Sequence, residues 1–262
     1  MSDLPPLIAV SLKMYLGVAA TRAWVAQVAD VGACLETDAN IELAVLPTFP
    51  LLESTAKTLA GTGICWGAQD VAASLDGAQT GEVSVEVLAE LGCRYVEIGH
   101  VERRRLFGED DDMVQAKVSQ VVGAGLVPLY CLGEAERGVP SDAAHACLVQ
   151  LQKLLDVAAG SEVVVAYEPT WAIGASVPAP AEYVADVCSH LRSRLNSYAG
   201  PSRLLYGGSA GPGTYQSLRP AVDGLFLGRF AHDTRALAQV VTEVITSGQS
   251  RIATFTSSKE QT

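Results

Sequence analysis

Eight short apolar runs recur along this 262-residue chain, and longer segments with helical patterning separate them. The runs are nearly continuous rather than alternating in hydrophobic character, which is typical of strands buried on both faces of a parallel sheet. The predicted strands are Leu7–Val10, Ile41–Leu46, Ile64–Ala68, Tyr95–Ile98, Val127–Leu132, Val163–Tyr167, Arg203–Tyr206 and Gly224–Leu227. The helices predicted between them include Thr21–Leu35, Ser84–Leu91, Met113–Ala124, Asp142–Ala158, Glu182–Asn196 and Thr234–Ile245.

The order of strand then helix, repeated eight times over about 250 residues, predicts an α/β fold, a single-domain (β/α)8 TIM barrel. A doubly wound open sheet is the alternative, but it usually carries a glycine-rich dinucleotide motif after an early strand. Here the first strand leads into Ser11-Leu12-Lys13-Met14 instead. We expect the barrel to span residues 1–246, and the polar segment 247–262, which lacks periodicity, to form a flexible tail.

The charge balance and the cysteine pattern exclude several classes of protein. With 29 Asp and Glu against 18 Lys and Arg, the net charge is −11, which disfavours nucleic acid or an anionic membrane as partner. No apolar stretch approaches the roughly 18 residues of a membrane helix, and no signal peptide is evident, so we expect a cytoplasmic protein. The histidines and cysteines show no metal-ligand spacing, so we predict no metal site. We expect free, buried thiols at Cys34, Cys65, Cys93, Cys131, Cys147 and Cys188.

Polar residues follow several predicted strands, where barrels of this kind carry their active sites. Lys13 follows the first strand, His100 the fourth and Glu168 the sixth. Each has an ordinary structural interpretation when taken alone, but a carboxylate after a buried strand is costly without a task or a partner. The glycine turns Gly207–Ser209 and Gly228–Arg229 leave backbone N–H groups open to an anion. A carboxylate base, a neutral electrophile and a cation are what proton abstraction beside a carbonyl requires, and the glycine turns add a cradle for a phosphate.

Five segments together carry a resemblance to a known family. They are Lys13-Met14, the run Thr80–Ser84, the run Gly99–Arg104 with Phe107–Glu109, the run Ala166–Gly174, and Tyr206–Ser209. On these segments, which occur in the family's order, the chain resembles triosephosphate isomerase over nearly its whole length.

The resemblance implies a role for each strand-end residue. Glu168 would shuttle a proton between adjacent carbons, His100 would polarise the carbonyl oxygen, and Lys13 would supply positive charge. The residues implied to offer backbone N–H groups to a substrate phosphate are Gly174, Ser209, Gly228 and Arg229. No cofactor is implied.

Further implied roles concern the surroundings of the site. The segment Pro169–Val177, which includes Trp171, would form a lid, and Tyr206 would either latch it or simply pack. Glu102 would be a second acid near the lysine, or only a first-turn helix residue that pairs with a neighbouring cation. Thr80 lies in the segment that resembles the family's dimer loop, which implies a homodimer.

Four departures from the family pattern bear on the substrate. Ser11 replaces an asparagine, and Val101 replaces a serine after the histidine. The second half of the lid reads Ala-Ser-Val-Pro-Ala over residues 175–179, and Gly228-Arg229 stands where the family has two glycines. The last two features resemble a branch of the family that isomerises erythrulose phosphates.

The sequence therefore predicts an isomerase that acts on a small phosphorylated ketose or aldose through an enediolate. The substrate ranked first is an erythrulose phosphate, converted to erythrose phosphate or another tetrose phosphate. Interconversion of dihydroxyacetone phosphate and glyceraldehyde 3-phosphate is the alternative, because one carbon is worth only about 1–3 kcal/mol of discrimination. A barrel that binds a sugar phosphate without catalysis is the remote alternative, since it would keep the glycine turns but need no base. The sequence leaves the position of the phosphate open.

Overall fold

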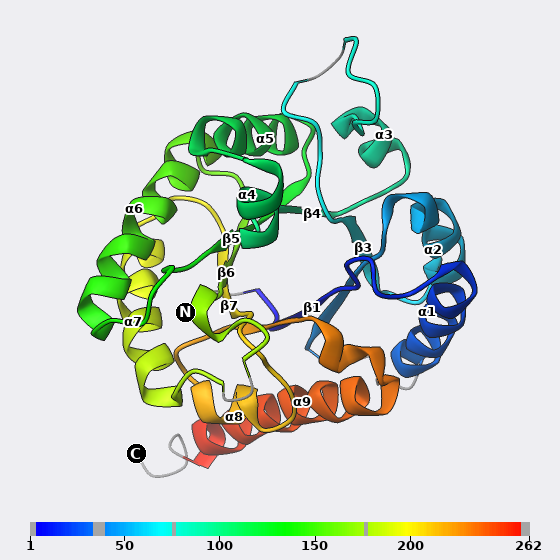
Figure 1. The fold of residues 1–262 in the computed structure, drawn as a ribbon. Helices are drawn as coiled ribbons and strands as arrows, with labels where there is room; N and C mark the ends of the chain where they lie inside the picture. The colour runs from blue at the N-terminus through cyan, green and yellow to red at the C-terminus, as the bar shows by residue number, and fades with distance from the viewer. Residues whose placement is uncertain (1–3, 34–39, 75–76, 176–177, 258–262) are drawn as a thin grey trace.

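Eight parallel strands close into a barrel in the computed structural model, with the strands in chain order around it (Figure 1). The structure describes residues 4–33, 40–74, 77–175 and 178–257. The strands are β1 (Leu7–Ser11), β2 (Glu42–Leu46), β3 (Cys65–Ala68), β4 (Tyr95–Ile98), β5 (Val127–Leu132), β6 (Val163–Tyr167), β7 (Ser202–Tyr206) and β8 (Gly224–Leu227). Because β1 pairs with both β2 and β8, the barrel is closed, and the predicted fold is confirmed.

Helices surround this barrel on the outside (Figure 1). They are α1 (Val18–Ala33), α2 (Leu52–Leu59), α3 (Val85–Glu90), α4 (Val101–Phe107), α5 (Asp111–Gly123), α6 (Pro140–Ala158), α7 (Ala181–Asn196), α8 (Thr214–Leu218) and α9 (Thr234–Ser257). Three short 3-10 turns lie at η1 (Phe49–Leu51), η2 (Thr170–Ala172) and η3 (Arg229–His232). The predicted first helix ended at Leu35, which lies outside the described residues, as does Cys34. Helix α9 continues past residue 246, and the flexible tail stays a prediction.

Strand residues alternate between two apolar layers. Leu7 and Ala9 of β1 belong to the cluster inside the barrel, with Leu129 of β5 and Leu205 of β7. Ile8 of β1 belongs to the larger cluster that includes residues of the surrounding helices. Since both faces of each strand are buried, the strands appear in the sequence as continuous apolar runs.

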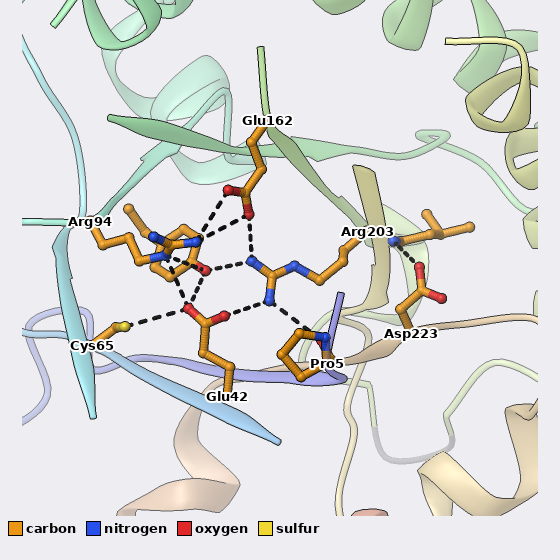
Figure 2. A network of polar contacts seen from close by, with 9 residues as sticks. Pro5, Glu42, Cys65, Arg94, Glu162, Arg203 and Asp223 are labelled. Atoms are coloured by element: carbon orange, nitrogen blue, oxygen red, sulfur yellow. Dashed lines mark hydrogen bonds and ion pairs between the residues drawn. The ribbon is translucent and has the colours of Figure 1, made fainter. Parts of the chain in front are cut away.

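A network of ion pairs closes the N-terminal end of the barrel (Figure 2). Arg203 is fully buried, and its guanidinium lies 2.8 Å from Glu42 and 2.7 Å from Glu162. Arg94 pairs with the same two carboxylates at 3.1 Å, and the Tyr95 hydroxyl donates a hydrogen bond to Glu42. This end is filled, so the polar residues at the opposite strand ends face the open mouth of the barrel.

Two further findings concern the described part of the chain. None of its helices is long and apolar enough to cross a membrane. Its five cysteines are free thiols, of which four are buried and Cys65 is half-buried.

Candidate active site

A cavity of about 610 Å³ opens at the carboxyl ends of the strands. The predicted site residues that line it are Ser11, Lys13, Glu102, Glu168, Gly174, Ser209, Gly228 and Arg229. These residues are far apart in the sequence, and strand ends from different parts of the barrel bring them together. No three His, Cys, Asp or Glu side chains of the described residues are grouped so that they could hold a metal ion.

Glu168 directly follows β6 and is only 7% exposed. Burial, together with the charge of the nearby Glu97, raises the pKa of its carboxyl to about 8, and the charge of Lys13 opposes this shift. Its Oε2 has no hydrogen-bond partner among the described residues. Gly207 leaves room for it, because a Cβ at residue 207 would lie 2.6 Å from Glu168 Cγ. Glu168 is thus a carboxyl with raised basicity and a free oxygen at the cavity.

His100 caps the N-terminus of α4, and Glu102 does lie in the first turn of this helix. Its Nδ1 accepts a hydrogen bond of 3.1 Å from the backbone N–H of Glu102. Burial, with the charge of Lys13, lowers the pKa of the imidazole to about 4, and the positive end of a helix dipole acts in the same direction. The ring is therefore neutral at pH 7 and carries its hydrogen on Nε2. This Nε2 lies 3.5 Å from Glu168 Oε2, so a neutral donor stands beside the base.

Lys13 forms an ion pair of 2.7 Å with Glu102, so the predicted second acid does lie beside the lysine. Burial lowers the pKa of the ammonium, but the bond to Glu102 and the charges of Glu168 and Glu97 raise it on balance. The lysine backbone has a φ of 48°, a left-handed conformation that is strained for a residue with a side chain. Gln69 Nε2 donates to the Lys13 carbonyl at 3.1 Å and holds this turn in place.

The predicted phosphate residues lie together on the wall formed by the loops after β6, β7 and β8. Gly174 has a φ of 72°, and Ser209 has a strained φ of 41°. The Ser209 hydroxyl donates to the Ala172 carbonyl at 3.0 Å and joins two of these loops. The Arg229 guanidinium lies close to Gly174 and 5.6 Å from the centre of the Tyr15 ring. It has no ion-pair partner within the described ranges, so its charge is available at the cavity wall.

The first half of the predicted lid is anchored to Glu134. Trp171 Nε1 donates to Glu134 Oε1 at 2.7 Å, and the backbone N–H of Thr170 donates to the Glu134 carbonyl at 3.0 Å. Residues 176 and 177, at the end of the predicted lid, lie outside the described residues. Tyr206 is buried, and a Cβ on Gly208 would lie 2.6 Å from the Tyr206 hydroxyl. The contribution of Tyr206 as a latch of the lid stays a prediction.

The cavity is also lined by Tyr15, Arg105 and Phe230, which were not predicted as site residues, and Glu97 beside Ser11 was missed as well. Glu97 of β4 is 4% exposed and accepts a hydrogen bond of 2.8 Å from Ser11 Oγ. Burial raises the pKa of its carboxyl to about 7, while the bond from Ser11 and the charge of Lys13 oppose the shift. The available signal was a charged residue within the apolar run Tyr95–Ile98, but this run was predicted only as a strand.

Comparisons with known proteins give the family of the chain. The triosephosphate isomerase family model matches residues 6–244. An L-erythrulose-1-phosphate isomerase of Pectobacterium atrosepticum is 43% identical over 254 residues, which cover 94% of this chain and 98% of the relative. A triosephosphate isomerase of Thermus thermophilus is 38% identical over 233 residues, covering 85% of this chain and 92% of the relative. Triosephosphate isomerase 2 of Listeria innocua is 32% identical over 249 residues, which cover 91% of this chain and 97% of the relative.

Proposed function

Since the chain belongs to the triosephosphate isomerase family, we propose that it isomerises an erythrulose phosphate by moving a proton through an enediolate. The observation that carries the chemistry is the pair of Glu168 Oε2 and His100 Nε2, 3.5 Å apart and both without a hydrogen-bond partner among the described residues. The choice of a four-carbon substrate is supported by the erythrulose-phosphate relative and by the Gly228-Arg229 pair.

Each group has one task in this reaction. The Glu168 carboxylate takes a proton from the carbon beside the substrate carbonyl, and the Nε2–H of His100 donates to the carbonyl oxygen as negative charge develops there. The Lys13 ammonium, which lines the same cavity, stabilises the same charge. Glu168 then returns the proton to the neighbouring carbon, so no atom or electron is gained or lost overall.

The position of the phosphate determines the product. In erythrulose 1-phosphate the enediolate forms across carbons 2 and 3, and protonation at carbon 2 gives erythrulose 4-phosphate, a ketose. The same step on erythrulose 4-phosphate, across carbons 1 and 2, gives the aldose erythrose 4-phosphate. We propose the 1-phosphate as the substrate, in line with the name of the 43% identical relative. The aldose product that the sequence analysis predicts would form from erythrulose 4-phosphate, not from the 1-phosphate.

Product analysis in deuterated water tests this function. We expect the enzyme to convert erythrulose 1-phosphate into the 4-phosphate, with deuterium on the newly protonated carbon, as followed by phosphorus and proton magnetic resonance. Turnover of dihydroxyacetone phosphate with no reaction of either erythrulose phosphate would instead support a triosephosphate isomerase, which the 38% identical Thermus relative keeps as the second candidate.

The raised pKa of Glu168 predicts the pH dependence of the reaction. The base must be ionised to accept a proton, so kcat/KM should be low at acid pH and should rise with an apparent pKa near 8. The substrate phosphate ionises with a pKa of about 6, which adds a second rise of kcat/KM at lower pH. A profile measured from pH 5 to 9.5 checks this, and a rate already constant above pH 6 would contradict it.

Binding of the phosphate should depend on Arg229 in addition to backbone N–H groups. We expect Arg229→Met to raise KM about tenfold, because a hydrogen bond to a charged group contributes about 1.5–3 kcal/mol. The value of kcat should stay within about threefold, since Arg229 lies beside Gly174, one of the proposed phosphate residues. Arg235→Met, at an exposed arginine, is the matched control. An unchanged KM, and an unchanged inhibition constant for inorganic phosphate, would show that Arg229 only packs on Tyr15.

We also propose a homodimer in the cytoplasm. Residues 77–84, which precede α3 and include the exposed Thr80, protrude from the ring of helices (Figure 1). Met14, beside the active-site lysine, is 89% exposed, as expected of an apolar side chain that a second copy covers. Light scattering should then give twice the chain mass of 27.4 kDa, and Met14→Arg should shift it toward the single-chain mass.

A further inference from the structure

Arg105 is a cation at the cavity to which the proposed mechanism gives no task. It lies in the last turn of α4, and its side chain is exposed where it lines the cavity. Val101, one helical turn earlier on the same face of α4, lines the cavity with it. Arg105 forms no hydrogen bond or ion pair with another of the described residues. Its guanidinium, which stays charged at any ordinary pH, is therefore available to a ligand in the cavity.

The charged groups at the cavity leave an excess of positive charge. These groups are Lys13, Glu102, Arg105, Glu168 and Arg229. Lys13 and Glu102 neutralise each other in their ion pair of 2.7 Å. Burial raises the pKa of Glu168 to about 8, so this carboxyl is mostly protonated at pH 7. The charges of Arg105 and Arg229 thus remain, and they attract anions to the cavity of a chain whose net charge is −11.

The two arginines come from opposite sides of the barrel. Arg229 follows β8, whereas Arg105 belongs to the helix that follows β4. Because the eight strands follow one another in chain order around the closed ring, β4 lies opposite β8. The proposed phosphate residues lie on the loops after β6, β7 and β8. A ligand whose phosphate binds there, beside Arg229, therefore has its other end on the side of Arg105.

The cavity has room for a ligand larger than a ketose monophosphate. Its volume of about 610 Å³ lies within the range of about 300–1,000 Å³ that is usual for pockets that bind drug-sized ligands. A four-carbon monophosphate is smaller than such ligands. A guanidinium presents a planar fork of N–H donors that matches the two oxygens of a phosphate or a carboxylate. A neutral hydroxyl group would use only part of this fork and would leave the charge of Arg105 uncompensated.

We propose that Arg105 forms a second anion subsite of the cavity, which binds four-carbon sugar derivatives that carry a phosphate at one end and a second anionic group, a phosphate or a carboxylate, at the other. A compound of this class competes with the ketose phosphate and inhibits the isomerase. The inference rests on the proposed function for the placement of the first phosphate. It adds a class of ligand that the isomerisation itself does not require.

Isothermal titration calorimetry with compounds that have no ketone or aldehyde group tests this subsite without turnover. Erythritol 4-phosphate has one anionic end, erythritol 1,4-bisphosphate has a phosphate at both ends, and erythronate 4-phosphate has a phosphate and a carboxylate. Each compound is titrated into wild type, Arg105→Met and Arg22→Met at pH 7 and low ionic strength. Arg22 is exposed on α1 and does not line the cavity, so its variant is the matched control for the loss of one positive charge. Thermal unfolding checks that both variants are folded.

We expect the wild type to bind erythritol 1,4-bisphosphate about tenfold more tightly than erythritol 4-phosphate, as for an additional charge-assisted contact. Arg105→Met should lose this gain and keep its affinity for erythritol 4-phosphate within about twofold, because the two subsites lie on different walls and act independently. Arg22→Met should behave as the wild type. The gain should shrink at high salt, since the Arg105 side chain is exposed.

The possible outcomes separate this inference from the proposed function. A gain for the bisphosphate alone identifies a second phosphate as the bound group, and a gain for erythronate 4-phosphate as well identifies any terminal anion; both support the inference. A wild-type gain no larger than the statistical factor for the two orientations of the bisphosphate overturns the inference alone, as does a gain that persists in Arg105→Met. If neither erythritol 4-phosphate nor the bisphosphate binds to the wild type, the proposed phosphate site is overturned together with the inference.

Discussion

Replacing Glu168 by glutamine is expected to lower kcat by about 10²- to 10⁴-fold, the contribution typical of a positioned general base. Glutamine has nearly the same shape but accepts no proton. The fold should not suffer, because burial raises the pKa of Glu168 to about 8, so its ionised form opposes folding above the ordinary glutamate pKa. We expect a melting temperature equal to or above that of the wild type.

The matched control is Glu182→Gln, at an exposed glutamate in the first turn of α7, which should retain full kcat. Steady-state assays of both purified variants give the two kcat values to be compared with that of the wild type. If Glu168→Gln keeps nearly the wild-type kcat, Glu168 is not the base, and the proton transfer described above does not occur at this residue.

Replacing Arg203 by methionine is expected to destabilise the barrel by about 3–5 kcal/mol, the usual loss when one partner of a buried ion pair is removed. Arg203 has no exposed side-chain area, and its loss leaves the partly exposed Arg94 as the remaining ion-pair partner of Glu42 and Glu162 among the described residues. Urea unfolding at pH 7 measures the change. Arg235→Met, at an arginine that is 89% exposed, should change stability by less than about 1 kcal/mol.

The pH dependence of this deficit has a definite sign. Burial raises the pKa of the Glu42 carboxyl, but the hydrogen bonds from Tyr95 and Arg203 outweigh burial and lower this pKa below its ordinary value. Its contribution to stability is therefore present above the ordinary glutamate range and is lost as pH falls toward the lowered pKa. Without Arg203 the carboxyl is relieved by protonation, so the variant's deficit should shrink between pH 7 and pH 4. A deficit that is constant over this range would contradict the role assigned to the ion pair.

The strands of the barrel could be predicted to within one residue at each end, because burial on both faces leaves an apolar signal that needs no partner to be recognised. Of helices α2, α4 and α8, the sequence predicted only the first turn of α4. They have eight, seven and five residues, too few for helical periodicity to be distinguished from chance. The interactions of Arg203 were also missed, since a charged residue near the start of a strand shows nothing of the carboxylates that meet it from β2 and from the segment before β6.

For the site, the sequence placed Lys13, His100 and Glu168 at strand ends, and the barrel topology explains why these residues meet. Their roles stay proposals that the variants above test. Glu97 was missed because its significance depends on contact with Ser11, 86 residues away in the chain. The direction of the Arg229 side chain was likewise open in the sequence, because a residue after a strand can turn toward the mouth or away from it. The placement of its guanidinium beside Gly174 is a property of the folded loops.

The central claim, a four-carbon ketose phosphate as substrate, is tested most directly by a side-by-side measurement of kcat/KM on the wild-type enzyme. Erythrulose 1-phosphate is compared with glyceraldehyde 3-phosphate at one pH and one ionic strength. We predict a value for the erythrulose phosphate at least about tenfold higher, a difference of about 1.4 kcal/mol, which a pocket for one additional carbon can supply. A higher value for glyceraldehyde 3-phosphate would contradict the account and identify the chain as a triosephosphate isomerase.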